Sequence, residues 1–261
     1  ARHREPLEAT AREIEEIKRG DSQFVETIVC DTTDAERLKP LLTEFVDHRG
    51  VPDYLINCVG HARPQYVQEL PLKDFRERME VNYYGQLVPI LALLPHFMEA
   101  RKGHIANVSS MMGYFGIMGY AAYAPTKFAI AGLTETLRHE LKPFNITCST
   151  LYPPDTDTPG FQKENESKPP ETAIISGNVK LQSAQQVAEA YRGSVLDSDL
   201  GLVAKHRPCA AKVLGEDGVA TGIGERRFEP DSTEGRAGET EVAGRQAPHL
   251  APDPALVLAE V

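Results

Sequence analysis

The chain has 261 residues, of which 41% are hydrophobic and 25% are charged, and this composition suits one α/β domain that carries an appendage. A formal net charge of -10 argues against nucleic acid or an anionic membrane surface as the main partner. The four cysteines are scattered without the spacing of a metal site or a disulfide framework, which favours a reduced compartment that faces the cytosol.

The first sixty residues alternate helical and strand patterns. Residues 1–20 have a polar and an apolar helical face, and the predicted helix ends at Gly20. Residues 24–30 alternate apolar and polar side chains, which predicts a strand, and a helical pattern follows from 35 to 50. Residues 54–58 form the next predicted strand. This alternation fits the α/β domain that the composition suggests.

A long helical stretch follows at 72–100, with an inner Pro95 that we expect to bend it. Its apolar run at 87–94 is the longest in the chain but is far shorter than the roughly 20 residues that a membrane span requires. The run therefore predicts a buried helix segment and no membrane span. Residues 104–108 are again apolar and predict a buried strand, which ends in two serines.

Two side chains with complementary chemistry stand four residues apart after this strand. Tyr123 and Lys127 lie where a helical pattern begins, and the spacing places the phenol and the ammonium on one helix face. A free tyrosine has a pKa near ~10, and a neighbouring ammonium is expected to lower it toward the working range. With a serine hydroxyl to hold a carbonyl oxygen, the pair would form an acid–base site that reduces a ketone or oxidises an alcohol. The alternative is a core aromatic beside a solvated lysine, which is an ordinary pair on a helix.

The serine, the tyrosine and the lysine together resemble the signature of the short-chain dehydrogenase/reductase family, a Ser followed by Tyr-x-x-x-Lys. Ser110, Tyr123 and Lys127 match the signature, and Ser109 fits its spacing less well. The resemblance implies a doubly wound parallel sheet of Rossmann type, with helices on both faces and the active site at the carboxyl ends of the strands. It also implies that Asn82 completes a catalytic tetrad by bulging its helix and holding a water that links the lysine to solvent.

Near its N-terminus the family carries an opening strand and a T-G-x-x-x-G-I-G turn, which lets the backbone approach the pyrophosphate of the cofactor. Neither pattern precedes the helix at 1–20, so we expect both to be absent from this chain. Arg2 matches the arginine with which many members bind the 2′-phosphate of the adenosine ribose, and this favours NADPH over NADH. The alternative is a solvated arginine near a helix start.

Two further positions resemble the family's adenosine site. Asp31 follows the predicted strand, where the family's aspartate hydrogen-bonds the adenine amino group. Alternatively, one of residues 32–34 caps the next helix, and Asp34 would then divide the two roles with Asp31. Asn57 and Gly60 belong to the run N-C-V-G, which resembles the N-N-A-G turn that the family places against the adenine ribose. Gly60 would supply the conformational freedom or the close approach that this turn needs.

Residues 146–152 predict another strand of the parallel sheet, and the loop after it resembles the family's P-G-x-x-x-T. Pro153 and Thr158 match this pattern, which implies contacts with the nicotinamide carboxamide and the phosphates, while a second proline replaces the glycine. The run from P-P-D-T-D-T-P-G-F onward is similar to one branch of the family, the 3-ketodihydrosphingosine reductases. This branch implies NADPH-dependent reduction of 3-ketosphinganine to sphinganine. Tyr123 would then protonate the ketone oxygen, and Lys127 would also bind the nicotinamide ribose.

The C-terminal part of the chain divides into a lid, a helix and a tail. Residues 160–180 are rich in proline, asparagine and lysine and would form a mobile lid over an acyl-chain groove, with a solvated connecting loop as the alternative. A helix is expected at 185–192, and the reductase domain would span residues 1–196. Residues 197–261 lack apolar periodicity and predict a mostly disordered tail. The T-G-I-G run at 221–224 lacks the flanking strand and helix of a cofactor site.

We therefore expect an NADPH-dependent reductase of a small-molecule lipid ketone. Two alternatives stay open. One is a reductase of the same family that acts on another steroid, retinoid or lipid ketone, and the other is a non-catalytic scaffold remnant with an incomplete cofactor site. The family resemblance also implies a homo-oligomer through the helices that hold Asn82 and Tyr123. It implies a cytoplasmic location, which in a eukaryote includes the cytosolic face of the endoplasmic reticulum.

Overall fold

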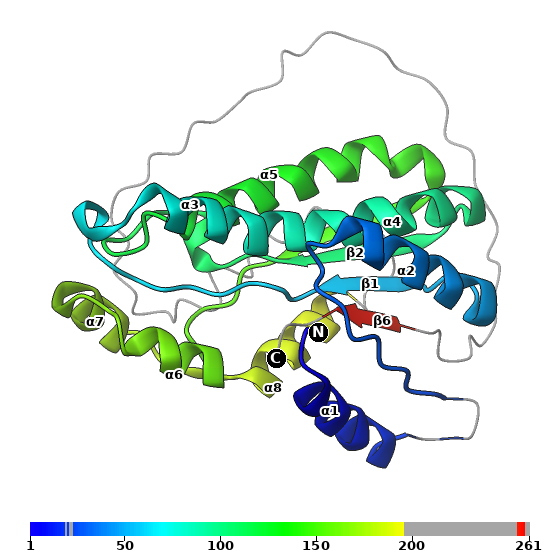
Figure 1. Ribbon diagram of the computed structural model, residues 1–261, viewed down its shortest axis with the longest axis horizontal. Coiled ribbons are helices and arrows are strands. Elements are labelled where there is room, and N and C mark those ends of the chain that lie inside the picture. The colour runs from blue at the N-terminus through cyan, green and yellow to red at the C-terminus, as the bar shows by residue number, and fades with distance from the viewer. Residues whose placement is uncertain (19, 21–22, 196–254, 259–261) are drawn as a thin grey trace, which may run out of the picture.

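Figure 1 shows a parallel β-sheet with helices on both sides. The computed structural model describes residues 1–18, 20, 23–195 and 255–258. Its main sheet has the order β3-β2-β1-β6, and neighbouring strands run parallel. The strands are β1 (Tyr54–Asn57), β2 (Gly103–Val108), β3 (Ile146–Leu151) and β6 (Ala255–Leu258). This layered parallel arrangement confirms the predicted doubly wound α/β fold.

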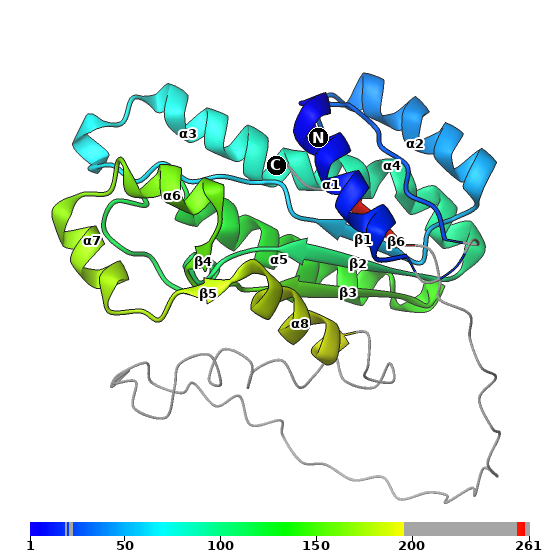
Figure 2. The same ribbon diagram turned by 90° about the horizontal axis from the view of Figure 1, so that it is seen from below.

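The helices form a layer on each side of the sheet, as a comparison of Figures 1 and 2 shows. On one side lie α2 (Ala35–Arg49), α3 (Leu72–Met79), α4 (Gly85–Ala100) and α5 (Ala124–Glu140). On the other side lie α1 (Arg4–Glu16) and α8 (Ala184–Val195). The core packs α2, α4 and α5 onto the sheet, and its most deeply buried side chains include Leu38, Leu42, Leu55, Leu93, Phe97 and Ile105. A parallel sheet covered in this way is expected to have strands with short, nearly continuous apolar runs, as β2 does.

Residues 24–30 contain no strand, although their alternating pattern predicts one. A strand forms only where a neighbouring segment pairs with it along a ladder of backbone hydrogen bonds. The amide of Cys30 donates to the carbonyl of Ala1 at 3.0 Å, but this contact does not extend into a ladder. The strand prediction is therefore wrong because the pattern does not show whether a partner is present.

The predicted helix at 72–100 is interrupted at Asn82, where the family resemblance implies a bulge. A π-helical turn, η2 (Glu80–Tyr84), separates α3 from α4 and contains Asn82. Helix α4 continues through Pro95 without a break, so the interruption falls at Asn82 and not at the proline. The apolar run at 87–94 lies in α4, as predicted, and half of its residues are buried, while Leu91 is 56% exposed. In the described part of the chain, no helix has the length and apolar character needed to cross a membrane.

The predicted lid contains two short helices rather than a flap or loop without secondary structure. They are α6 (Pro159–Asn165) and α7 (Pro170–Gly177), and each carries a proline in its first turn, where the missing amide costs no helical hydrogen bond. A small parallel pair, β4 (Thr156–Asp157) and β5 (Gln182–Ser183), joins the two ends of this segment. Short 3₁₀ turns are η1 (Val67–Glu69), η3 (Met111–Gly113) and η4 (Lys142–Phe144).

Of the predicted tail at 197–261, the structure describes residues 255–258. They form β6, in which Ala255 pairs with Tyr54 and Leu258 pairs with Asn57. The composition of the tail does not reveal this strand, because its partner β1 lies far away in the sequence. The rest of the tail prediction, including the T-G-I-G run at 221–224, lies outside the described residues.

Candidate active site

Strand β2 leads directly into two serines, and the structure separates their roles. Ser109 is buried, and its hydroxyl donates to the backbone carbonyl of Lys127 at 2.9 Å. Ser110 accepts a hydrogen bond from the amide of Met112 at 3.2 Å, and its hydroxyl is also hydrogen-bonded to the phenol of Tyr123. Ser109 therefore anchors helix α5, while Ser110 is the serine that meets Tyr123, as the spacing predicts.

Tyr123 and Lys127 lie at the start of α5. Tyr123 is the residue that precedes the helix, and Pro125 lies in its first turn, where its missing amide costs no helical hydrogen bond. Lys127 is only 3% exposed, and its Nζ donates to the carbonyl of Val108 at 3.0 Å. The same Nζ lies 5.6 Å from the centre of the Tyr123 ring. Burial lowers the pKa of Lys127 to about 8, and the neighbouring Cys58 opposes this shift.

The pKa of Tyr123 is raised, not lowered. Burial is the largest cause, the hydrogen bond with Ser110 opposes it, and the charges of Glu164 and Asp155 add to it. The expectation that this pKa is lowered is wrong in this structure, because burial of the phenol is the largest cause of the shift and Lys127 is not among its causes. A raised pKa keeps the phenol protonated at neutral pH. Tyr123 is thus in the form that donates a proton.

Asn82 connects the turn after β1 with the first turn of α5. It is fully buried, and its carboxamide accepts a hydrogen bond from the amide of His61 at 2.9 Å. It donates to the carbonyl of His61 and to the hydroxyl of Thr126, both at 3.1 Å. Thr126 in turn donates to the carbonyl of Tyr123 at 2.7 Å. The π-helical turn therefore holds Asn82 where it braces the start of α5, next to Tyr123 and Lys127.

Gly60 stands where a side chain would not fit. Its φ angle is +152°, and a Cβ atom would lie 3.0 Å from Nζ of Lys127 and 3.2 Å from Oδ1 of Asn82. Glycine is therefore required both by the backbone conformation and by the space. The glycine thus lets this turn lie directly against Lys127 and Asn82.

The side chain of Asn57 lies inside the protein. Its amide donates to Asn107 at 2.8 Å, and Asn107 donates to Thr134 at 2.9 Å, with all three residues fully buried. Asn57 thus ties β1 to β2, and through it to α5. A cofactor contact at this position would come from the backbone of the turn, which is the part that the resemblance to N-N-A-G implies.

Arg2 and Asp31 lie beside each other at a small concavity near the start of the chain. Nη1 of Arg2 is 4.0 Å from Oδ2 of Asp31, and both side chains are nearly half exposed. Burial raises the pKa of Asp31, but hydrogen bonds from Thr33 and the charge of Arg2 outweigh it and hold the pKa below its ordinary value. Asp34 caps α2 by accepting a hydrogen bond from the amide of Arg37 at 3.1 Å. The capping role therefore belongs to Asp34, and Asp31 stays beside the arginine.

A cavity of about 740 Å³ opens beside Ser110, Tyr123 and Lys127. Ligand sites in proteins typically enclose roughly 300–1,000 Å³, so the cavity has the size of a ligand site. Pro153 and Thr158, which were predicted to meet a cofactor, both line it. Its apolar lining includes Ile56, Met111, Phe115, Phe161, Ile175 and Val187.

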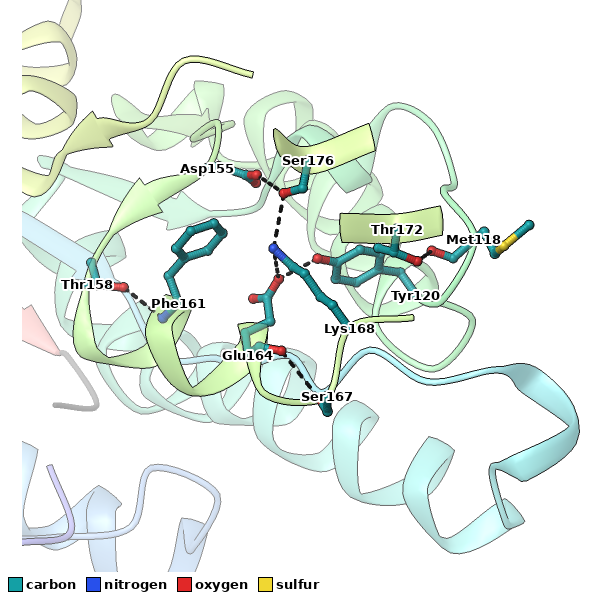
Figure 3. Close-up of polar contacts among 10 residues, drawn as sticks. All are labelled: Met118, Tyr120, Asp155, Thr158, Phe161, Glu164, Ser167, Lys168, Thr172 and Ser176. Atoms are coloured by element: carbon teal, nitrogen blue, oxygen red, sulfur yellow. Dashed lines mark hydrogen bonds and ion pairs between the residues drawn. The ribbon is translucent and has the colours of Figure 1, made fainter. Parts of the chain in front are cut away.

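A polar cluster on the lid side of the cavity has no counterpart among the residues predicted from the sequence (Figure 3). The hydroxyl of Tyr120 donates to Glu164, and the hydroxyl of Ser176 donates to Asp155. Nζ of Lys168 lies 3.5 Å from Glu164 and donates to Ser176 at 3.1 Å. We call these five residues the lid cluster. They come from the loop before α5, the loop after β3 and the segment of α6 and α7, so they are too far apart in the sequence to form a recognisable motif.

Residues 1–169 match a family model described as short chain dehydrogenase. The chain belongs to the short-chain dehydrogenase family. The matched region contains Asn82, Ser110, Tyr123 and Lys127, which the structure brings together around one end of the cavity or directly behind it. The family membership that the sequence motifs imply is thus confirmed.

Curated relatives carry the name of one branch of this family. The chain is 42% identical over 179 residues to the 3-ketodihydrosphingosine reductase of Dictyostelium discoideum, a match that covers 67% of this chain and 54% of that protein. It is 39% identical over 190 residues to the 3-dehydrosphinganine reductase of Danio rerio, with 72% and 57% covered. The resemblance to this branch is confirmed. The chain spans about half the length of the curated relatives that it matches.

Solved structures share the fold. A short-chain dehydrogenase from Streptomyces avermitilis superposes with a TM-score of 0.64 and 25% identity, covering 78% of this chain and 75% of that one. The NAD+-bound xylitol dehydrogenase gives a TM-score of 0.62 with 27% identity, covering 72% of this chain and 78% of that one. Both similarities agree with the parallel sheet and helical layers described above.

Proposed function

We propose that the chain carries the active site of a reductase that converts 3-ketosphinganine to sphinganine with NADPH. The observation that carries the proposal is the convergence of Ser110, Tyr123 and Lys127 at one end of a ligand-sized cavity, with Asn82 bracing them. The substrate class is taken from the curated relatives, which are named as reductases of this ketone.

The side chains around the cavity can hold and protonate a ketone oxygen. Ser110 and Tyr123 are hydrogen-bonded to each other, so one carbonyl oxygen can receive O–H donors from both. Tyr123 would transfer its proton to that oxygen as negative charge develops there, and its raised pKa keeps this proton available. Lys127, with a pKa of about 8, is mostly charged at neutral pH and would stabilise the phenolate that remains.

A nicotinamide cofactor fits the residues on this side of the cavity. Tyr123 and Lys127 both line the cavity, so the ribose hydroxyls of a cofactor could approach the ammonium and the phenol from it. Pro153 and Thr158 line the same cavity and would contact the carboxamide and the phosphates. When bound, the cofactor supplies the hydride that the ketone carbon receives.

The preference for NADPH is proposed from Arg2. Its guanidinium is half exposed at the concavity that also contains Asp31, and a guanidinium binds a phosphate through two parallel hydrogen bonds. Asp31, which stays ionised more readily than usual, would accept a hydrogen bond from the adenine amino group.

We also propose a homo-oligomer and a cytosol-facing location, as the family resemblance implies. Exposed apolar side chains on η2, α4 and α5 support the former, since such groups commonly mark interfaces: Tyr84, Leu91 and Phe128 are 44%, 56% and 45% exposed. The cysteines that the structure describes are free thiols, which supports a reduced compartment: Cys30, Cys58 and Cys148.

The test is NADPH-dependent formation of sphinganine from 3-ketosphinganine, followed by NADPH absorbance and by mass spectrometry of the product, with NADH as the control. The proposal expects product with NADPH and much less with NADH. NADPH binding, measured by nicotinamide fluorescence, without turnover of this ketone would favour another ketone substrate. Neither binding nor turnover would favour a scaffold without catalysis.

A further inference from the structure

The lid cluster places two carboxylates on the wall of the catalytic cavity. Glu164 and Asp155 both line the cavity, and their charges are among the causes that raise the pKa of Tyr123. The ring of Tyr120, which donates to Glu164, has its centre 5.8 Å from the centre of the Tyr123 ring. A substrate whose carbonyl oxygen is held by Tyr123 therefore lies close to negatively charged oxygens.

The cluster carries one negative charge in excess. Its two carboxylates face one ammonium, that of Lys168, which is 3% exposed and lies 4.1 Å from the centre of the Phe161 ring. Lys168 pairs with Glu164 at 3.5 Å and donates to the hydroxyl of Ser176. Burial raises the pKa of Glu164, and the hydrogen bond from Tyr120 and the charge of Lys168 oppose this shift. The two contacts also fix the orientation of the carboxylate, as Figure 3 shows. Lys127, Lys180 and Arg192 line the cavity as well, so the excess charge belongs to the cluster, and an ammonium bound against the cluster would balance it.

The lid is anchored so that Glu164 keeps this position. The hydroxyl of Thr172 in α7 donates to the carbonyl of Met118 at 2.9 Å, which fastens α7 to the loop before α5. Thr158 caps α6 by accepting from the amide of Phe161 at 3.1 Å. The Thr172 bond thus ties α7 to the loop before α5, whereas the Thr158 cap fixes only the start of α6. Helix α6 contacts that loop through the bond between Tyr120 and Glu164 itself.

We propose that the Glu164 carboxylate binds the ammonium group of a 2-amino ketone and so selects this substrate class over ketones without the amine. The inference rests on the proposed function, because the proposed substrate carries an amine on the carbon next to its ketone. Once Ser110 and Tyr123 hold the carbonyl oxygen, that ammonium must lie in the same part of the cavity. Glu164 is assigned the contact because it is joined to Tyr120, whose ring packs near Tyr123, whereas Asp155 accepts from Ser176.

Two ketones that differ only in the amine test the inference. One is a short-chain analogue of 3-ketosphinganine, chosen to avoid micelles, and the other carries hydrogen in place of the amino group. We expect wild-type protein to prefer the amino ketone in kcat/KM, and Glu164→Gln to reduce this preference by about 10- to 100-fold, mainly through KM. Glutamine keeps the shape and can still accept the hydrogen bond of Tyr120.

Glu166→Gln is the matched control, because it removes the same charge from an exposed side chain just beyond α6. It should leave the preference within twofold of wild type. An unchanged preference in Glu164→Gln, or a loss equal to that in Glu166→Gln, would overturn the inference. A reduced preference for the amino ketone in Asp155→Asn, with no reduction in Glu164→Gln, would also overturn the inference, since the ammonium would then bind Asp155 instead.

A binding experiment separates this inference from the proposed function. Calorimetric titration compares a short-chain 2-amino-1,3-diol, the product analogue, with the same diol without the amine, and it requires no turnover. We expect wild-type protein to bind the amino diol at least tenfold more tightly, and Glu164→Gln to remove the difference. Equal binding of the two diols by wild type would overturn the inference even if 3-ketosphinganine is reduced. Selective binding without turnover would instead count against the proposed reaction alone.

Discussion

Replacing Asn82 with alanine should destabilise the protein substantially. The side chain is fully buried and makes three hydrogen bonds, to the amide and carbonyl of His61 and to the hydroxyl of Thr126. A buried polar group left without a partner typically costs about 1–3 kcal/mol. Thr126 keeps its bond to Tyr123, so the two backbone groups of His61 dominate the loss. We therefore expect Asn82→Ala to lower the free energy of unfolding by about 2–4 kcal/mol.

Urea unfolding followed by circular dichroism measures this change. Asn178→Ala is the control, because Asn178 is exposed and its side chain bonds only the end of its own helix, at the carbonyl of Ile174. The control should stay within about 0.5 kcal/mol of wild type. A loss below about 1 kcal/mol in Asn82→Ala would refute the reasoning, since it would mean that the buried contacts of the π-helical turn contribute little.

Three further predictions concern the lysine, the serines and the arginine. Lys127 has a folded-state pKa of about 8, below its usual ~10.4, so burial of its charge costs stability at pH 7, and this cost disappears as the pH rises toward ~10. In urea unfolding, Lys127→Met should thus have a free energy of unfolding about 1–3 kcal/mol above that of wild type at pH 7, and this gain should vanish near pH ~10. A stability difference that does not vary with pH would contradict the prediction. Ser110→Ala should lower kcat by about 10²-fold, whereas Ser109→Ala should mainly lower the melting temperature, and a reversed pattern would exchange their roles. Arg2→Ala should weaken NADPH binding about tenfold with little effect on NADH binding. The control is Arg4→Ala, which loses a surface ion pair with Glu8 of its own helix and should leave the binding of both cofactors unchanged. If Arg2→Ala weakens the binding of both cofactors equally, Arg2 does not recognise the phosphate.

The sequence predicted those parts of the site that depend on local spacing. Tyr123 and Lys127 are one helical turn apart, so helix periodicity places them near each other. The prediction of Ser110 rests on its match to the spacing of the family signature, and the structure agrees, because Ser110 meets Tyr123 while Ser109 bonds the backbone of α5.

Features that depend on distant partners could not be predicted in this way. The pattern at 24–30 is that of a strand, but a strand also needs a neighbour, and none forms a ladder with it in the described residues. The pairing of Tyr120 with Glu164 spans 44 residues, and Lys127 turns toward Val108 rather than only toward the tyrosine. The raised pKa of Tyr123 follows from this packing, which spacing along one helix does not show.

Tyr123→Phe tests the central claim most directly, because it removes one hydroxyl and leaves the ring in place. The measurement is the single-turnover rate of ketone reduction at saturating NADPH, with the NADPH dissociation constant measured by fluorescence titration and Tyr84→Phe, an exposed tyrosine, as the control. The account predicts that Tyr123→Phe lowers the rate by about 10²–10⁴-fold while NADPH affinity stays within a fewfold of wild type. A rate equal to that of wild type would contradict it, because the proton would then come from another group.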